Sequence, residues 1–128
     1  MKKLLTFSVF IAITIFIWGQ DKNNVRPFIP GYKENDTIRL DDFLKIKEIS
    51  LSNKSKVESF VLVYTDNGYD FMMKGNTNTL NEEMKARLLK FKSRNLKYLK
   101  ISLKAVAYRT LQNEEIKTGP VKYVLKIK

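Results

Sequence analysis

Carboxylates are the side chains of this sequence best suited to acid–base chemistry, and several of them are adjacent in the chain. There is no His and no Cys among the 128 residues, which removes the commonest general bases, nucleophiles and soft metal ligands. A carboxylate pair could still act as acid and base, and Glu82-Glu83 and Glu114-Glu115 are adjacent pairs. Because neighbouring side chains diverge on a helix or a strand, neither pair forms a shared site. We therefore predict that the chain is not an enzyme and that it uses no cofactor.

The stretch TDNGYD places three oxygen-bearing side chains, those of Asp66, Asn67 and Asp70, within five residues. This spacing resembles part of a calcium loop, but it lacks the full ligand set and the closing Glu of an EF-hand. Asn67-Gly68 lies between two strand-like runs, and this dipeptide favours a hairpin because both residues tolerate positive φ. The sequence therefore predicts a hairpin turn here and no metal site.

Lysines are the charged residues that recur at alternate positions near the C-terminus. Lys100 and Lys104 lie on the outer face of one predicted strand, and Lys122 and Lys126 lie on the outer face of the next. If the two strands pair, four ammonium groups share one sheet face with Tyr98. Like charges directly opposite are unfavourable, so an acidic partner would relieve them. The alternative is a solvated face whose lysines guard an edge strand. A single Tyr is too few for the aromatic stacking that single-stranded nucleic acid requires, so no nucleic-acid partner is predicted.

Five segments have patterns of apolar residues that are typical of strands, either alternating with polar residues or continuous. They are residues 43–52, 56–65, 69–74, 96–109 and 121–128. The second is apolar at every position from Phe60 to Tyr64, which predicts a central strand covered on both faces. In the fourth, the residues predicted to face inward are Leu99, Ile101, Leu103, Ala105 and Ala107, whereas Val106 is predicted to face outward. The polar segment 110–120 is predicted as a hairpin loop.

Residues 80–92 predict one amphipathic helix. Thr79 followed by Glu82 fits a capping box at its start, and Glu83 is spaced to pair with Arg87 on the outer face. A single apolar stripe is formed by Leu80, Met84, Leu88 and Phe91. The helix is therefore expected to lay this stripe on the sheet.

Together these elements predict an α+β fold of antiparallel β hairpins with one covering helix, in the order β-ββ-α-ββ. The folded part is expected to begin near Leu40, which gives one domain over residues 41–128. Residues 20–40 are rich in Asn, Pro, Gly and charge, so they predict a linker or an extended arm.

The first 19 residues have the layout of a signal peptide. Lys2 and Lys3 precede the apolar run 4–18, and a small residue precedes a cut before Gln20. A spanning helix needs about 20 apolar residues, so an uncleaved inner-membrane anchor is the less favoured alternative. We therefore expect a periplasmic or secreted protein, whose formal charge falls from +11 to +9 when residues 1–19 and their two lysines are removed.

Four segments resemble the C-terminal domain of GldM, a periplasmic protein of gliding motility and type IX secretion. They are VESFVLVY (57–64), GNTNTLNEEMKARLLKFK (75–92), LKYLKISLKAVA (96–107) and GPVKYVLKIK (119–128), and the resemblance spans about residues 46–128. In that family a strand pair is followed by a Gly-Asn helix start, a helix and two further strands. In that family a transmembrane helix and several periplasmic domains precede this domain. In this sequence the expected linker, residues 20–40, stands in their place. The resemblance therefore implies a contact domain and not a force-transmitting protein.

The expected function is that of an exported, non-catalytic protein-interaction domain, and the resemblance implies an accessory of the type IX secretion or gliding machinery. Its expected partners are envelope or secretion-machine proteins, contacted through a sheet edge or through the lysine-bearing face. A cell-envelope module that binds anionic glycan or lipid headgroups, with peripheral membrane contact, is the alternative. The sequence leaves the oligomeric state open.

Overall fold

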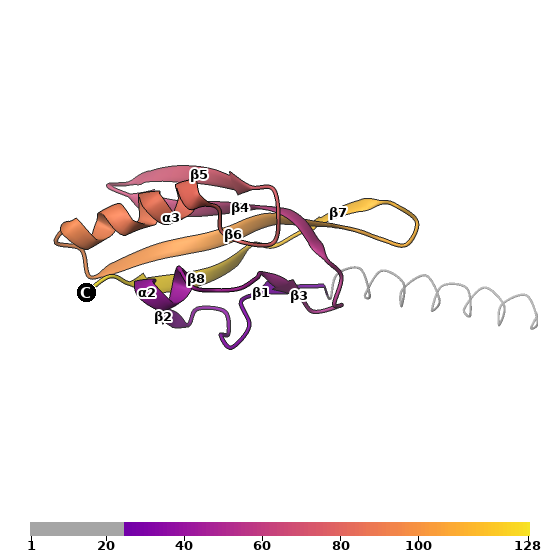
Figure 1. Ribbon diagram of the computed structural model, residues 1–128, viewed down its shortest axis with the longest axis horizontal. Helices are drawn as coiled ribbons and strands as arrows, with labels where there is room; N and C mark the ends of the chain where they lie inside the picture. The colour runs from indigo at the N-terminus through magenta and orange to yellow at the C-terminus, as the bar shows by residue number, and fades with distance from the viewer. Residues whose placement is uncertain (1–24) are drawn as a thin grey trace, which may run out of the picture.

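A twisted β-sheet dominates the computed structural model, which describes residues 25–128 (Figure 1). The strands are β1 (Pro27–Phe28), β2 (Thr37–Arg39), β3 (Ser50–Leu51), β4 (Val57–Asp66), β5 (Tyr69–Gly75), β6 (Tyr98–Arg109), β7 (Glu115–Thr118) and β8 (Val121–Lys126). The helices are the four-residue α2 (Leu40–Phe43), α3 (Glu82–Leu89) and the 3-10 helix η1 (Lys90–Ser93). The fold is thus mixed α+β and mostly sheet.

Long-range pairing arranges the main sheet in the order β2-β8-β6-β4-β5, with β7 added to the end of β6. All of these pairs are antiparallel except β2 with β8, which is parallel. The antiparallel hairpins predicted from the sequence are therefore present, and a parallel strand from the N-terminal region is added to them. The short strands β1 and β3 form a separate two-stranded sheet.

The predicted hairpin at Asn67-Gly68 is confirmed. Asp66 pairs with Tyr69 across a two-residue loop, and the loop residues have φ angles of 52° and 81°. Positive φ at both central residues is the geometry that matches the right-handed twist of the flanking strands. Asn and Gly adopt this geometry at low cost, so local sequence is sufficient to set this turn.

The predicted apolar stripe is buried, but α3 starts two residues later than expected and ends at Leu89, so Leu80 precedes the helix and Phe91 lies on η1. Leu80, Met84, Leu88 and Phe91 are all buried in the core, and Glu83 pairs with Arg87 at 3.0 Å. The predicted Thr79 capping box is wrong. The N-cap is Asn81, whose Oδ1 accepts a 2.8 Å hydrogen bond from the backbone N–H of Met84. Thr79 instead shares a 3.1 Å hydrogen bond with the hydroxyl of Thr77.

Replacing Asn81 with alanine is expected to lower the free energy of unfolding by about 1 kcal/mol, because the Met84 N–H loses its capping acceptor. The matched control is Thr79→Ala, which removes the hydroxyl of the position favoured by the sequence pattern. Urea unfolding followed by circular dichroism measures both variants. A larger loss for Thr79→Ala than for Asn81→Ala would contradict the observed cap.

The N-terminal arm is part of the folded core, so the expected start near Leu40 is wrong. Ile29 and Ile38 are completely buried, and Val25 is nearly so. The backbone N–H of Ile29 donates a buried 3.0 Å hydrogen bond to the hydroxyl of Tyr123. Composition suggested a linker because the apolar residues of the arm are few and separated by polar residues. Those few residues nevertheless reach one shared core.

The predicted strand over residues 43–52 is mostly wrong. Its first residue ends the short helix α2, and only Ser50–Leu51 is a strand. Ile49 and Leu51 are both buried, as alternation requires, but only Leu51 lies on a strand, and that strand pairs with β1 and not with the main sheet. The alternation of these two apolar residues therefore predicted their burial correctly, but it predicted a strand that is too long.

Strand β6 contains a bulge that reverses its inward face. Opposite β4, Val61 pairs with Lys104 and Ser59 pairs with Ala107, so β6 carries one extra residue. Ala105, inside this interval, has a φ of 49°. Val106 and Tyr108 consequently join the core, whereas Ala105 is only half-buried. The prediction that Ala105 faces inward and Val106 outward is wrong for this reason.

The segment predicted as a long polar loop is a second hairpin. Residues Glu115–Thr118 form β7 and pair with the end of β6, from Arg109 opposite Glu115 to Val106 opposite Thr118. Only residues 110–114 connect the two strands. The side chains of β7 are exposed or half-buried, so the strand lacks the apolar alternation that would have revealed it.

The predicted signal peptide, residues 1–19, lies outside the described residues. Among residues 25–128, no helix has both the length and the apolar character needed to cross a membrane.

Candidate binding groove on the open sheet face

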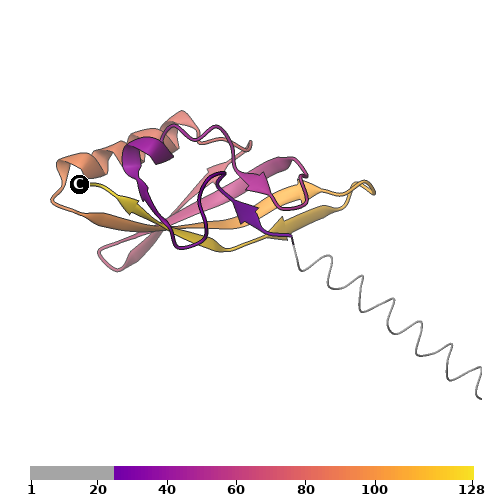
Figure 2. The same cartoon turned by 90° about the horizontal axis from the view of Figure 1, so that it is seen from below.

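One face of the main sheet is covered and the other is open. Figure 2 shows α2, α3 and the small sheet on the same side of the main sheet. Their buried residues form one cluster with the inward residues of β4, β6 and β8. Among the described residues, no element covers the opposite face. The expectation that Phe60–Tyr64 is covered on both faces is therefore wrong, although Val63 on the open side is still buried by its neighbours.

The register of β6 and β8 brings the predicted lysines to this open face. Lys100 and Lys104 come from β6, and Lys122 and Lys126 come from β8. They are staggered and not opposite one another. The cross-strand pairs are Lys100 with Val124, Lys122 with Ser102, Lys126 with Tyr98, and Lys104 with Val61. Direct opposition among the four lysines, which the sequence suggested, is thus avoided, although Lys126 lies opposite Arg39 of β2 on its other side.

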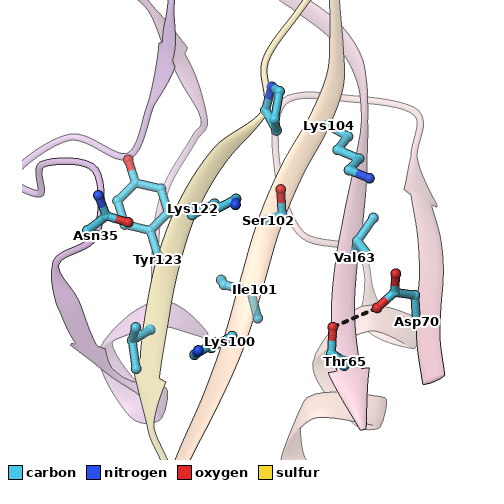
Figure 3. A pocket seen from close by; sticks show the side chains of 12 residues that line it. Asn35, Val63, Thr65, Asp70, Lys100, Ile101, Ser102, Lys104, Lys122 and Tyr123 are labelled. Atoms are coloured by element: carbon cyan, nitrogen blue, oxygen red, sulfur yellow. Dashed lines mark hydrogen bonds between the residues drawn. The ribbon is translucent and has the colours of Figure 1, made fainter. Parts of the chain in front are cut away.

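Three of the four lysines line a groove of about 530 Å³ on this face (Figure 3). Its lining residues are Asn35, Val63, Thr65, Asp70, Lys100, Ile101, Ser102, Lys104, Pro120, Lys122, Tyr123 and Val124. Val63 and Val124 supply apolar surface between the ammonium groups. Asn35 reaches the groove from the arm, where its backbone N–H donates a 2.7 Å hydrogen bond to the carbonyl of Lys122. The groove therefore combines positive charge with apolar surface.

The hydroxyl of Ser102 is buried on this face without a hydrogen-bond partner among residues 25–128. Ser102 lies between Val63 on β4 and Lys122 on β8. Buried hydroxyls in proteins are normally hydrogen-bonded, and a ligand oxygen or a water could satisfy this one. The unpaired hydroxyl and the neighbouring ammonium group are both donors, so together they favour an acceptor-rich ligand.

Several acidic side chains of the described chain pair with cations outside the groove. Asp66 makes hydrogen bonds of 2.7 and 3.0 Å with Arg94, and this contact lowers the pKa of Asp66 and raises that of Arg94. Glu34 pairs with Arg26 at 3.2 Å. Glu34 also accepts a 3.4 Å hydrogen bond from the backbone N–H of Lys122. The ammonium group of Lys122 forms no ion pair within residues 25–128.

Asp70 is the one acidic residue in the groove lining, and its carboxylate already accepts a hydrogen bond from a neighbouring side chain. Its Oδ1 accepts a 2.6 Å hydrogen bond from the hydroxyl of Thr65 (Figure 3). Among residues 25–128, Lys100, Lys104 and Lys122 form no ion pair. The groove thus presents an excess of positive charge that the described chain does not neutralise.

Tyr98 and Lys126 share the open face but lie outside the groove. They lie opposite each other on β6 and β8, next to the Lys100–Val124 pair on the same face. Tyr98 is 54% exposed. Lys126 lines a smaller hollow with Arg39 and Asp41. The predicted surface is therefore brought together as a face, and its densest part is the Lys100, Lys104 and Lys122 groove.

Sequence reasoning missed Ser102 and Asn35. Ser102 alternates in phase with Lys100 and Lys104, so this phase was a signal that could have identified it. Asn35 gave no signal, because its position depends on the arm returning to β8.

The adjacent carboxylates do not form shared sites. Glu83 pairs with Arg87, Glu82 lies 3.8 Å from Lys85, and Glu115 lies 3.7 Å from Arg109. Over residues 25–128 there is no group of three His, Cys, Asp or Glu side chains placed to hold a metal ion.

No protein-family model matches the sequence, and no curated protein matches it either. The resemblance to the GldM C-terminal domain therefore stays a prediction.

Proposed function

We propose that this chain is an exported, non-catalytic protein-interaction domain whose groove takes an acidic segment of an envelope or secretion-machine protein. The observation that carries the proposal is the groove itself. Three ammonium groups that have no acidic partner among residues 25–128 lie beside apolar surface and a buried hydroxyl that has no hydrogen-bond partner in the same part of the chain. Charge complementarity between such a surface and a partner accelerates association and selects the partner by the sign of its charge.

The mixture of charge and apolar surface favours a polypeptide ligand. Val63 and Val124 separate the lysines of the groove, and an extended peptide presents its side chains alternately to such a surface. Carboxylates could reach the ammonium groups while apolar side chains contact the valines. The resemblance to a contact domain of the secretion machinery supports the same type of partner.

A fluorescent peptide of alternating Glu and Val residues is a defined probe for this proposal. We expect it to bind the protein at low salt, to weaken as salt rises, and to bind at least about tenfold more weakly to Lys100→Glu/Lys122→Glu. The matched control is Lys47→Glu/Lys90→Glu, which makes the same charge change at exposed positions outside the groove lining. Fluorescence anisotropy measures all three proteins.

Pull-down from envelope extract then tests the class of partner. Secretion-machine proteins recovered by the unchanged chain and by the control, but not by the groove variant, are the expected result. Equal weakening of peptide binding in the groove variant and in the control would contradict the proposed site, because the effect would then follow net charge alone.

Anionic glycan or lipid headgroups are the second candidate ligand. The observation that favours them is the Ser102 hydroxyl beside Lys122, since a hydroxyl and an ammonium group together suit a phosphate, sulfate or carboxylate oxygen. Salt-sensitive binding to anionic liposomes or to an acidic polysaccharide, lost in Lys100→Glu/Lys122→Glu while the peptide fails to bind, would select this candidate over the first.

A further inference from the structure

Strand β5 forms a free edge of the main sheet. It is the last strand in the order β2-β8-β6-β4-β5, and among residues 25–128 no strand pairs with its outer side. Figure 1 shows β5 along the upper border of the molecule. Tyr69 and Met72 on this strand are 72% and 71% exposed, and Phe71 is also exposed. An edge strand with exposed apolar side chains is a template for pairing with another strand.

The hairpin geometry determines which backbone groups point outward. In a two-residue hairpin the closing pair, here Asp66 and Tyr69, exchanges hydrogen bonds, and bonded and non-bonded pairs then alternate. The N–H and C=O groups of Asp70, Met72 and Lys74 are therefore directed away from β4. One contact agrees with this direction: the side-chain amide of Asn81 donates a long 3.4 Å hydrogen bond to the carbonyl of Lys74. That carbonyl retains a second lone pair.

The charges of β5 are arranged symmetrically about Met72. Asp70 lies two residues before Met72 and Lys74 lies two residues after it, and all three side chains are on the open face. If a second β5 approached antiparallel with Met72 opposite Met72, Asp70 of each copy would lie opposite Lys74 of the other. The outward N–H and C=O groups of the same three residues would be in register for ladder hydrogen bonds.

We propose that β5 pairs with β5 of a second copy of this chain, antiparallel and centred on Met72, so that the two sheets become continuous. The arrangement is closed by a two-fold axis, because the same surface is used by both copies. It covers Met72 and brings the exposed rings of Tyr69 and Phe71 against the facing strand. Shifting the register by two residues would remove both Asp70–Lys74 contacts, so the charges select this register.

The proposed contact is small, because one short strand from each copy forms it. Interfaces at the low end of the size range are weak and transient, so pairing should depend on protein concentration. The alternative is that Asp70 and Lys74 keep this edge solvated and prevent pairing. In that case the protein stays unpaired at every concentration.

Cysteine cross-linking in the full chain tests the pairing, because the natural sequence contains no Cys. Residues directly opposite across a hydrogen-bonded pair are about 5.5 Å apart at Cα, a separation that a disulfide can span. Met72→Cys should therefore give a covalent dimer on mild oxidation. Lys90→Cys, exposed on η1, is the control for random collisions.

The register has its own cross-linking test. Asp70→Cys mixed with Lys74→Cys should give mainly the mixed dimer, whereas each variant alone should give little. A yield for Met72→Cys no higher than for Lys90→Cys, or equal self-linking by the Asp70→Cys and Lys74→Cys proteins, would overturn the proposal.

Exchanging the charges of Asp70 and Lys74 distinguishes a loss of strand pairing from other effects of a substitution on the dimer yield. In the Met72→Cys background, Asp70→Lys or Lys74→Asp alone makes both cross-copy contacts repulsive, and the dimer yield should fall about three- to tenfold. The double exchange Asp70→Lys/Lys74→Asp restores opposite charges and should restore the yield. Failure of the double exchange to recover yield, with an unchanged circular dichroism spectrum, would contradict the proposed register. The readout needs no acidic ligand, so its result is independent of the groove.

Discussion

Replacing Ile38 with alanine is expected to lower the free energy of unfolding by about 2–5 kcal/mol. Ile38 is completely buried and lies on β2, opposite Leu125 in the parallel pair with β8. Truncation removes buried methyl groups and leaves a cavity, because the surrounding side chains relax only partly. The free energy of unfolding of a domain is typically only about 5–15 kcal/mol, so this single change is expected to remove a large part of it.

Thr37→Ala is the matched control for Ile38→Ala. Thr37 is the exposed neighbour on the same strand, so its truncation leaves no buried cavity and should change stability by less than about 0.5 kcal/mol. Urea unfolding, monitored by circular dichroism, measures both variants. Equal and small effects at the two positions would mean that the arm behaves as a linker, contrary to the observed packing of β2.

Tyr123→Phe is expected to lower the free energy of unfolding by about 1–3 kcal/mol. The hydroxyl of Tyr123 accepts the 3.0 Å hydrogen bond from the buried backbone N–H of Ile29. Without the hydroxyl, that N–H would be buried with no acceptor, and the desolvation penalty of the group would be felt in full. The same change at Tyr108, a buried ring for which no hydroxyl hydrogen bond is found among residues 25–128, should cost less.

The contribution of Tyr123 should also depend on pH. Burial raises the pKa of Tyr123 above its usual value near 10, and this effect exceeds the opposing influence of the Ile29 N–H. Nearby Glu34 and Asp36 raise the pKa further. A raised pKa in the folded state means that the neutral hydroxyl stabilises the fold fully below about pH 10 and that this stability is lost as pH rises through the folded pKa.

The stability difference between the unchanged protein and Tyr123→Phe should therefore shrink above about pH 10. Parallel urea titrations at neutral and alkaline pH measure it. A difference that stays constant or grows over the alkaline range would contradict a buried, neutral Tyr123.

Features governed by local sequence were predictable. The Asn67-Gly68 turn has its own backbone preference, the stripe of α3 has the helical period, and the inward positions of β8 alternate strictly. The shared face of the lysines was also predictable, because strand alternation places Lys100, Lys104, Lys122 and Lys126 on one side whenever β6 and β8 pair. In each case the signal and the structure involve residues only a few positions apart.

Features governed by distant contacts were not predictable. The arm has too few apolar residues to indicate a core element, yet Ile29 and Ile38 are buried by β8, about 90 residues later in the chain. The bulge at Ala105 reverses alternation because β4 and β6 must both fit one twisted sheet. Alternation before the bulge contains no information about it.

The sequence alone thus determined which residues are apolar, which turn closes β4 and β5, and which strand faces carry lysine. Only the tertiary structure decided that the arm enters the core, that the four lysines are staggered and not opposite one another, and that the hydroxyl oxygen of Ser102 is buried without a hydrogen-bond partner among residues 25–128. The physical reason is that periodicity specifies the face of a strand, whereas register and neighbours are set by the free energy of the whole packed sheet.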